Sequence, residues 1–471
     1  MLGQRRGHLP LRSARPKTKP CCRPRVAAFA IFLAALWLLV MFNLRRLDAM
    51  KAAVRAPPAP SSLSHTASPP PADDAPHYVL ATFVNGATLG DGLRLLHSSD
   101  GYAWEALPGA PVLLPLAETG GRVFRDPSIV LHDGIFHLVW SSDLCVGQLP
   151  GKWQCREERG PHRPKPRFGY ARSTNLLRWE GVRLIEVDLP DACSLWAPEL
   201  SVLGAADGGG FSVTFSATQV AGACPKNFKK TAHRAWSVTS ADMVSFSAPR
   251  RLLETEDESI IDLFPMLDAV APGSGPRHAL VYKAEKNDCK RREWTAGRPV
   301  RAADGCTLVL RLARAHNASG PWTPDRSASG GFFPGALSRP CVEGPAPFRL
   351  PSGEWLVLVD AYRDDCTVFE PPPCDGTTVG GAEASAAAMR AGAADGAGAA
   401  APPRSCAFSP SRKGFGAIKS SGGALDRWVD VSAQVSAPEG YKHGTVVTIA
   451  RSRWKEIRQS FSRVGTYSHF A

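Results

Sequence analysis

Beyond residue 76 the sequence lacks any long stretch in which apolar residues recur with the 3.6-residue period of an α-helix. Short apolar runs rich in β-branched and aromatic residues take its place. Such runs are typical of strands. The absence disfavours a helical bundle, and we predict an all-β domain.

The cysteines lack the spacing of a zinc site. Two of the twelve, Cys21 and Cys22, precede an apolar run and are candidates for palmitoylation or for free thiols. The other ten contain no C-x-x-C pair, and their even number favours disulfides in an oxidising compartment. One glycosylation sequon, Asn317-Ala318-Ser319, fits the same compartment.

Acidic residues are nearly absent from the N-terminal segment. Residues 1–55 contain twelve basic residues and one acid, Asp48, whereas residues 76–471 carry a net charge of only +4 out of the total of +13. The basic character therefore belongs to one end of the chain and not to the folded domain. This distribution disfavours nucleic acid as a partner.

One long apolar run is present, at residues 26–44. Its 19 residues are enough for a bilayer core of about 30 Å, and the basic residues in front of it keep the N-terminus cytoplasmic. We predict a cytoplasmic basic tail (1–25), an uncleaved transmembrane signal-anchor (26–44) and a disordered Pro/Ser stem (45–76) of a type II membrane protein. A cleaved signal peptide is the alternative. The short anchor and the stem favour the Golgi, with a lumenal domain, over the plasma membrane.

The domain repeats itself. Five small-polar turns each precede a large aromatic residue, at spacings of 75, 67, 76 and 106 residues. An Ala/Gly/Pro-rich insert at 372–404, which we expect to be a disordered loop, explains most of the excess in the last spacing. About 70 residues per unit suits a four-stranded propeller blade. The aromatic residues are Trp104, Trp179, Phe246, Trp322 and Trp428, and we expect the first, second and last to lie in the core.

Four blades can be traced in order, and the strands left over complete a fifth. The late strand 444–450 would be innermost. Three strands from the start of the domain, the first of which begins at His77, would complete its blade. Pairing the two chain ends in this way removes an exposed sheet edge. We therefore predict a five-bladed β-propeller over residues 77–450, rather than two sandwiches, followed by a basic, solvated C-terminal tail (451–471).

Acidic residues recur where the innermost strands begin. The motifs Arg125-Asp126-Pro127, Ile261-Asp262 and Glu343-Gly344-Pro345 each open an apolar run, and Glu199 and His443 lie near two other starts. The innermost strands of a propeller run in the same sense along the channel, so these side chains should converge on one mouth. Three carboxylates around one opening suit the hydrolysis of a glycosidic bond.

The long loops between second and third strands lie on the same face as this mouth. They, or the segments just before innermost strands, contain all ten cysteines of the domain. Bridged loops would brace a binding site. We predict the pairs Cys145–Cys155, Cys193–Cys224 and Cys289–Cys306, with Cys341, Cys366, Cys374 and Cys406 unassigned.

Four motifs in chain order resemble those of glycoside hydrolase family 43, the five-bladed arabinosidase and xylosidase group. They are R-D-P-S-I (125–129), W-A-P-E-L (196–200), the Ile261-Asp262 element and E-G-P (343–345). Y-K-H-G-T-V (441–446) is similar to the closing-blade segment of that family. The resemblance covers roughly residues 78–450.

The resemblance implies a role for each acid. Asp126 would be the general base that activates water, and Glu343 the general acid that protonates the leaving oxygen. Asp262 would raise the pKa of that acid and hold its orientation. The family's I-D-P motif departs here, because Leu263 follows Asp262 in place of the proline that would stiffen the turn. Asp268 is the alternative for this role.

The remaining site residues are predicted as substrate contacts. Trp196 would stack on a sugar ring, Arg363 would reach a hydroxyl, and Glu199 is either a contact or a structural, pKa-tuning group. His443 resembles the family's channel histidine, which often touches water or calcium; a hydrogen-bonded core histidine is the alternative. No cofactor is required, and a structural Ca²⁺ in the central channel is the one metal considered.

The sequence predicts a membrane-anchored glycosidase that hydrolyses arabinosyl, xylosyl or galactosyl glycans with inversion. A glycan-binding propeller without activity is the second hypothesis. A family 32-like fructosidase or a glycoside phosphorylase is the third, although the N-D-P motif that the fructosidase would need is absent. The sugar, the linkage and the oligomeric state are left open.

Overall fold

The chain divides into two units, residues 1–69 and 70–471, and all described residues lie in the second. The computed structural model describes residues 75–467 except for 85–91, 110, 115–120, 150–154, 156–157, 160–163, 225–231, 256–257, 271–274, 286–307, 331–334, 339–341, 362–413 and 422–424. The predicted anchor, the insert and all but the last two residues of the predicted stem lie outside these residues. Among the helices of the described part, none is both long and apolar enough to cross a membrane.

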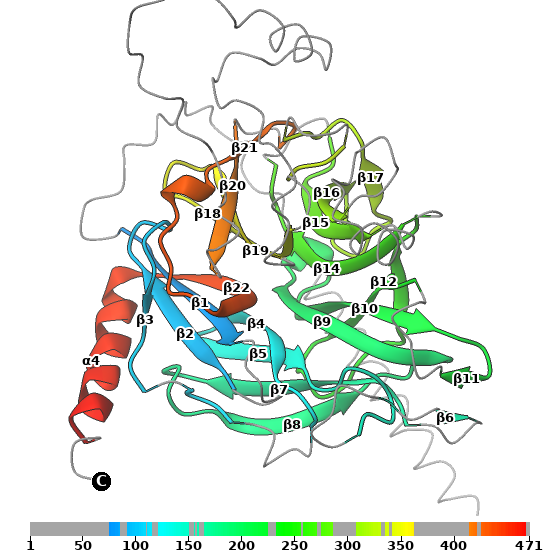
Figure 1. Cartoon of the computed structure of the whole chain (residues 1–471), viewed down its shortest axis with the longest axis horizontal. Coiled ribbons are helices and arrows are strands. Elements are labelled where there is room, and N and C mark those ends of the chain that lie inside the picture. Colours follow the sequence, from blue (N-terminus) through cyan, green and yellow to red (C-terminus); the bar gives the residue numbers. More distant parts are fainter. Residues whose placement is uncertain are drawn as a thin grey trace, which may run out of the picture. The chain divides into compact units, whose positions relative to one another are not determined.

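Five four-stranded antiparallel sheets surround a common centre (Figure 1). From the innermost strand outwards, blade 1 consists of β4 (Arg125–His132), β5 (Ile135–Ser141), β7 (Arg167–Ser173) and β8 (Glu180–Glu186). Blade 2 consists of β9 (Ala192–Val202), β10 (Phe211–Gln219), β12 (Arg234–Ser240) and β13 (Arg250–Leu253). Blade 3 consists of β14 (Ser259–Met266), β15 (His278–Glu285), β16 (Leu308–Ala315) and β17 (Thr323–Asp325).

Blade 4 consists of β18 (Val342–Arg349), β19 (Trp355–Ala361), β20 (Phe415–Ser420) and β21 (Trp428–Asp430). Blade 5 joins the two ends of the domain: β22 (Tyr441–Ile449) is innermost, followed by β1 (His77–Val84), β2 (Arg94–Ser98) and β3 (Glu105–Ala106). Two short strands, β6 (Glu158–Arg159) and β11 (Ala223–Cys224), pair outside the blades. Two 3₁₀ turns, η2 (Ala205–Asp207) and η6 (Ser432–Gln434), lie in connections.

The ring is closed, as predicted, by antiparallel pairing of the last strand with the first. In this pairing Tyr78 faces Thr448 and Leu80 faces Val446. Each innermost strand also contacts the innermost strands of the two neighbouring blades, in the order β4, β9, β14, β18, β22 and back to β4. The prediction of a five-bladed all-β propeller is therefore confirmed.

The same polar turn recurs before the repeated aromatic residues. Three serine hydroxyls, from Ser98, Ser173 and Ser240, accept a backbone N–H from the residue three positions later. A following Asp or Asn caps the next two amides, so the turn satisfies its own backbone. Trp104 and Trp428 are buried as predicted, whereas Trp179 is only half-buried. These turns explain why the repeat is visible in the sequence.

Each innermost strand contains one residue in the left-handed backbone region, at the same place in the blade. The φ values are 50° at Asp126, 44° at Ala197, 54° at Asp262, 59° at Gly344 and 42° at His443. The ladder to the second strand shifts register at each of these points. A non-glycine residue rarely adopts this conformation, and such residues gather at functional sites. The five bulges mark the candidate site.

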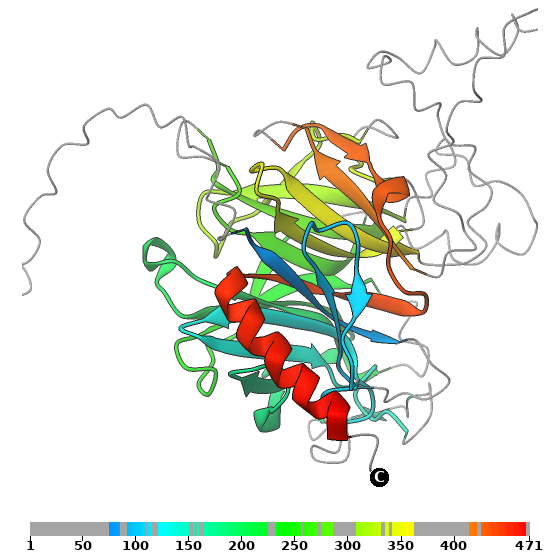
Figure 2. The ribbon, with the colours of Figure 1, turned by 90° about the vertical axis from the view of Figure 1, so that its left-hand side faces the viewer.

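The C-terminal segment differs from its prediction. Instead of a solvated tail, residues Arg451–Tyr467 form helix α4, which lies beside β1, β2 and β3 of blade 5 (Figures 1 and 2). Trp454, Ile457 and Phe461 are buried in the core shared by blades 5 and 1, and the indole of Trp454 stacks on the His97 ring with 3.9 Å between centroids. The three apolar residues lie on one face of the helix. The high density of basic residues hides this pattern in the sequence.

Candidate active site

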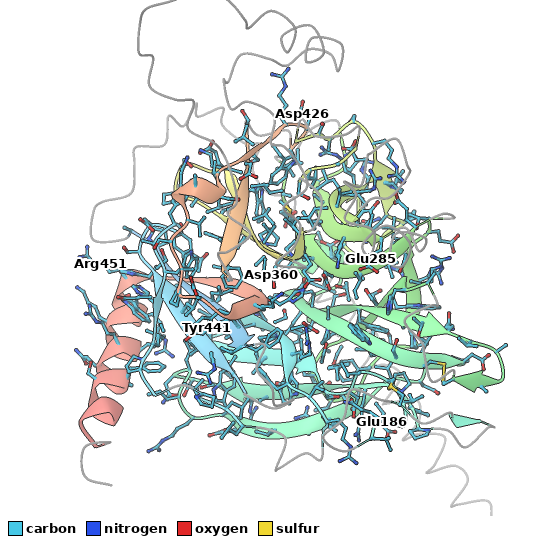
Figure 3. The ribbon with its side chains drawn as sticks, in the orientation of Figure 1. Glu186, Glu285, Asp360, Asp426, Tyr441 and Arg451 are labelled. Carbon is cyan, nitrogen blue, oxygen red and sulfur yellow. A yellow bond between two sulfur atoms is a disulfide. The ribbon has the colours of Figure 1, made fainter. Side chains whose placement is uncertain are left out.

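His443 lies at the centre of the converging carboxylates. Its Nε2 is 3.2 Å from Asp262 Oδ2, and its Nδ1 is 3.5 Å from Asp126 Oδ1 and 3.8 Å from Asp360 Oδ2. The side chains of all four residues are at most 8% exposed. The imidazole thus connects blade 5 to blades 1, 3 and 4. Figure 3 shows Asp360 near the middle of the ring.

Asp126 is held by its own blade, whereas Asp262 is held by the neighbouring blade 4. The Ser141 hydroxyl donates to Asp126 Oδ2 at 2.8 Å. The Gly344 N–H donates to Asp262 Oδ2 at 3.2 Å. The lack of a proline after Asp262 therefore does not displace it, because its backbone adopts the same left-handed conformation as Asp126.

Glu343 approaches the group from blade 4. It precedes the left-handed Gly344, and one of its oxygens lies within 4.8 Å of donor atoms of Asp262 and His443. Lys283 Nζ donates to its Oε2 at 2.9 Å, and Lys442 Nζ lies 3.9 Å from its Oε1. The three predicted catalytic acids therefore share one site.

The charges at the centre stabilise one another. Burial lowers the pKa of His443, but the carboxylates of Asp360, Asp262 and Asp126 outweigh burial and raise it to about 10. Burial raises the pKa of Asp262, but the imidazolium and Lys283 lower it overall, below its ordinary value. Near neutral pH, His443 is thus a cation, and Asp262 is the carboxylate that pairs with it.

Two other buried acids differ from Asp262. Burial and the nearby Glu343 raise the pKa of Asp360 to about 6, against the lowering by His443 and Lys442. Burial raises the pKa of Glu199 well above its ordinary value, although its carboxyl accepts a hydrogen bond from Thr445 at 3.2 Å. Burial thus favours the protonated form of Glu199, whereas Asp360 takes up a proton only as the pH falls towards about 6.

The donor atoms do not suit direct binding of a metal by His443. Within the described residues, Asp262, Glu343 and His443 form the one group of His, Cys, Asp or Glu donors close enough to share an ion. Calcium takes six to eight oxygen ligands, whereas this group offers two carboxylates and one imidazole nitrogen. The channel calcium stays a prediction, and no step below uses it.

The other predicted residues have different positions. Glu199 is buried on the channel side of β9. Trp196 is half-buried, its indole N–H donates to the Leu144 carbonyl at 2.7 Å, and its stacking on a sugar stays a prediction. Arg363 lies outside the described residues. Asp268 is exposed beyond the far end of β14, where it pairs with Arg277, so it cannot replace Asp262.

Disulfides brace the rim of the mouth as predicted. Cys145–Cys155 and Cys193–Cys224 are both formed. The second bridge ties the start of β9 to β11, in the loop after β10. The strand β11 pairs with β6 in the loop of blade 1. The other six cysteines of the domain lie outside the described residues, so the Cys289–Cys306 pair stays a prediction.

Several site residues escape analysis of the motifs alone, chiefly Ser141, Lys283 and Asp360. Each lies on a second strand, directly opposite the residue that precedes the left-handed one: Arg125 faces Ser141, Ile261 faces Lys283, and Glu343 faces Asp360. A lone polar residue near the end of an apolar second strand is thus the signal that could have found them.

The fold and this cluster define the class: a five-bladed propeller with an acid-lined mouth of the kind found in glycosidases. Residues 73–369 match the model of a family related to glycoside hydrolase family 43, described as "Probable glycosyl hydrolase domain". The chain belongs to this family. The match ends before β20, β21 and the closing strand β22.

Solved structures give weaker likenesses. A xylan β-1,4-xylosidase from Bacillus halodurans C-125 is 14% identical, with a TM-score of 0.39 over 61% of this chain and 48% of that one. This chain thus spans about half of the xylosidase. An endo-arabinase from Bacteroides thetaiotaomicron VPI-5482 is 12% identical, with a TM-score of 0.40 over 61% and 89% of the two chains. An α-L-arabinofuranosidase from Lactobacillus brevis is 13% identical, with a TM-score of 0.37 over 69% and 74%.

These TM-scores are too low for the likenesses to add weight of their own. A comparison with curated proteins found no match.

Proposed function

We propose that the protein is an inverting glycoside hydrolase with Asp126 as general base and Glu343 as general acid. The observation that supports this most is the meeting of Asp126, Asp262 and Glu343, from three separate blades, around the buried His443. Buried acids cost free energy unless they are paired. A purely structural role would therefore not explain why three bulged strands bring like charges together.

In the proposed reaction, the Asp126 carboxylate accepts a proton from water as the water oxygen bonds to the anomeric carbon. The glycosidic C–O bond breaks on the opposite face of the sugar, and Glu343 gives its proton to the leaving oxygen. Ser141 fixes Oδ2 of Asp126 by a hydrogen bond. After product release Glu343 regains a proton from solvent and Asp126 loses one.

Asp262 would act on this reaction through electrostatics. It is the ionised partner of His443 and accepts the N–H of Gly344, the residue next to Glu343. A negative charge this close opposes ionisation of a neighbouring carboxyl, which is the role expected of the third acid. The left-handed conformation and the His443 contact hold it there.

The proposed substrates are arabinosyl, xylosyl or galactosyl groups on oligosaccharides, polysaccharides or glycoproteins. The proposed setting is the Golgi lumen, with the domain attached through the apolar run at 26–44. Specificity would be set by the disulfide-braced rim loops, which surround the mouth.

The experiment is product release from a panel of aryl glycosides by the purified full chain. Asp126→Asn and Glu343→Gln should each reduce kcat/KM by at least about 100-fold, the lower range of general acid or base catalysis. Asp268→Asn is the matched control, because that exposed acid lies beyond the other end of β14. Retained turnover in both site variants would refute the assignment.

One observation favours a second function, a propeller that binds glycans without cleaving them. Lys283 Nζ donates to Glu343 Oε2 at 2.9 Å, so one oxygen of the proposed acid is engaged by an ammonium group and is not free to protonate a leaving group. Calorimetric affinity for a glycan that the unmodified protein does not hydrolyse would support this function.

A further inference from the structure

Lys283 is a buried charged residue in a strand with an apolar middle, Ala279–Tyr282. It lies on β15, its side chain is 1% exposed, and it faces Ile261 across the ladder. Lysine is almost never this deeply buried unless it is paired, because removing its charge from water is costly. Packing alone would be better served by an aliphatic residue of similar volume. The position therefore calls for a reason other than stability.

The partners of Lys283 supply that reason. Its ammonium group contacts Glu343 Oε2 at 2.9 Å and Glu285 Oε1 at 3.0 Å. Glu285 is itself only 3% exposed and lies two residues further along the same strand, towards the mouth. Figure 3 shows Glu285 on the sheet next to that of Asp360. Two buried carboxylates therefore share one buried ammonium.

This sharing has two consequences for the carboxyl of Glu343. First, the ammonium group fixes Oε2. The orientation of the Glu343 side chain is then set by Lys283, which lies on β15 of the neighbouring blade. Second, the ammonium group is also held by Glu285, so its own position does not depend on Glu343 alone. The other oxygen, Oε1, lies on the side of the half-exposed Lys442, 3.9 Å from its Nζ, which is beyond hydrogen-bond distance.

We propose that Lys283, anchored by Glu285, is the positioning residue that aims Oε1 of Glu343 at the leaving oxygen of the substrate. This inference rests on the proposed function, because it assumes that Glu343 is the proton donor. It assigns no contact between Lys283 and the substrate. Its effect should therefore be on kcat and not on substrate affinity.

The test compares four variants of the full chain on the best aryl glycoside from the panel. Lys283→Met should reduce kcat about 100-fold, the loss typical of a small misplacement of a catalytic group, with KM within about threefold. Lys283→Arg, which keeps the charge and a donor, should recover at least about tenfold of that loss. Glu285→Gln should reduce kcat about tenfold at unchanged KM, since one of two anchors is lost.

Lys419→Met is the matched control, because Lys419 also pairs with a glutamate, Glu354 at 3.1 Å, but on the outer part of blade 4. It should keep kcat within about twofold. Circular dichroism checks that each variant folds, and if Lys283→Met does not fold, Glu285→Gln decides.

The outcomes separate this inference from the proposed function. If Lys283→Met or Glu285→Gln turns over with the kcat of the unmodified protein, this inference is overturned and the proposed function is not. An equal loss in Lys283→Met and Lys283→Arg, or a loss that falls on KM, also overturns it. No turnover by the unmodified protein overturns the proposed function, and this inference with it.

Discussion

Replacement of Gly344 by alanine should destabilise the protein more than a glycine replacement elsewhere. Gly344 has a φ of 59°, and a Cβ at this position would lie 2.1 Å from Cδ2 of His443. The left-handed conformation costs alanine about 1–2 kcal/mol. The contact adds about 1–3 kcal/mol, because the buried His443 is held by Asp262 and cannot move aside freely. We expect a total loss of about 2–5 kcal/mol in the free energy of unfolding.

Gly353 provides the matched control. It has a φ of 85°, but a Cβ there would meet nothing within 4 Å. Gly353→Ala should therefore cost only the conformational part, about 1–2 kcal/mol. Urea unfolding of both variants, followed by the fluorescence of the twelve tryptophans, measures the difference. Equal losses would refute the claim that His443 is tightly held against Gly344.

Three further predictions concern stability. Trp454→Ala should cost about 3–5 kcal/mol, whereas the exposed Lys455→Ala on the same helix should stay within about 0.5 kcal/mol; equal melting temperatures would contradict the docking of α4. Replacing Cys193 and Cys224 by serine opens a bridge across 31 residues and should cost about 4 kcal/mol in urea, so an unchanged midpoint would count against the bridge. The pKa of His443 is about 10 in the folded protein and about 6.5 in the unfolded chain. Its contribution to the free energy of unfolding is therefore complete below pH 6.5 and falls as the pH rises towards 10. If the free energy of unfolding of His443→Gln falls with pH as steeply as that of the unmodified protein, this ion network is contradicted.

The fold could be predicted because its repeat is local. Three of the five blades carry a Ser-x-Asp or Ser-x-Asn turn whose serine caps a following amide, at Ser98, Ser173 and Ser240. Such turns and the apolar runs between them depend on neighbours in sequence. The closing pair β22–β1 followed because a ring leaves no strand unpaired. Helix α4 was missed because its three core residues, at 454, 457 and 461, are separated by charged ones.

The candidate site could be predicted only in part, for the same physical reason. Asp126 and Glu343 belong to short proline-containing motifs that are visible in the sequence. Lys283, Asp360 and Ser141 lie on second strands, outside the motifs. Each reaches the site through the register in which its strand pairs with an innermost strand: β15 with β14, β19 with β18, and β5 with β4. That register depends on a left-handed bulge in each innermost strand, which no local sequence rule specifies for Ala197. Contacts across strands therefore had to come from the structure.

The central claim is that Asp126 activates water at this mouth. The most direct measurement is proton NMR of the first product released from an aryl glycoside by the full chain, in parallel with Asp126→Asn. The account predicts a product of inverted anomeric configuration and a loss of turnover of at least about 100-fold in the variant. A product of retained configuration, or unchanged turnover by Asp126→Asn, would contradict it.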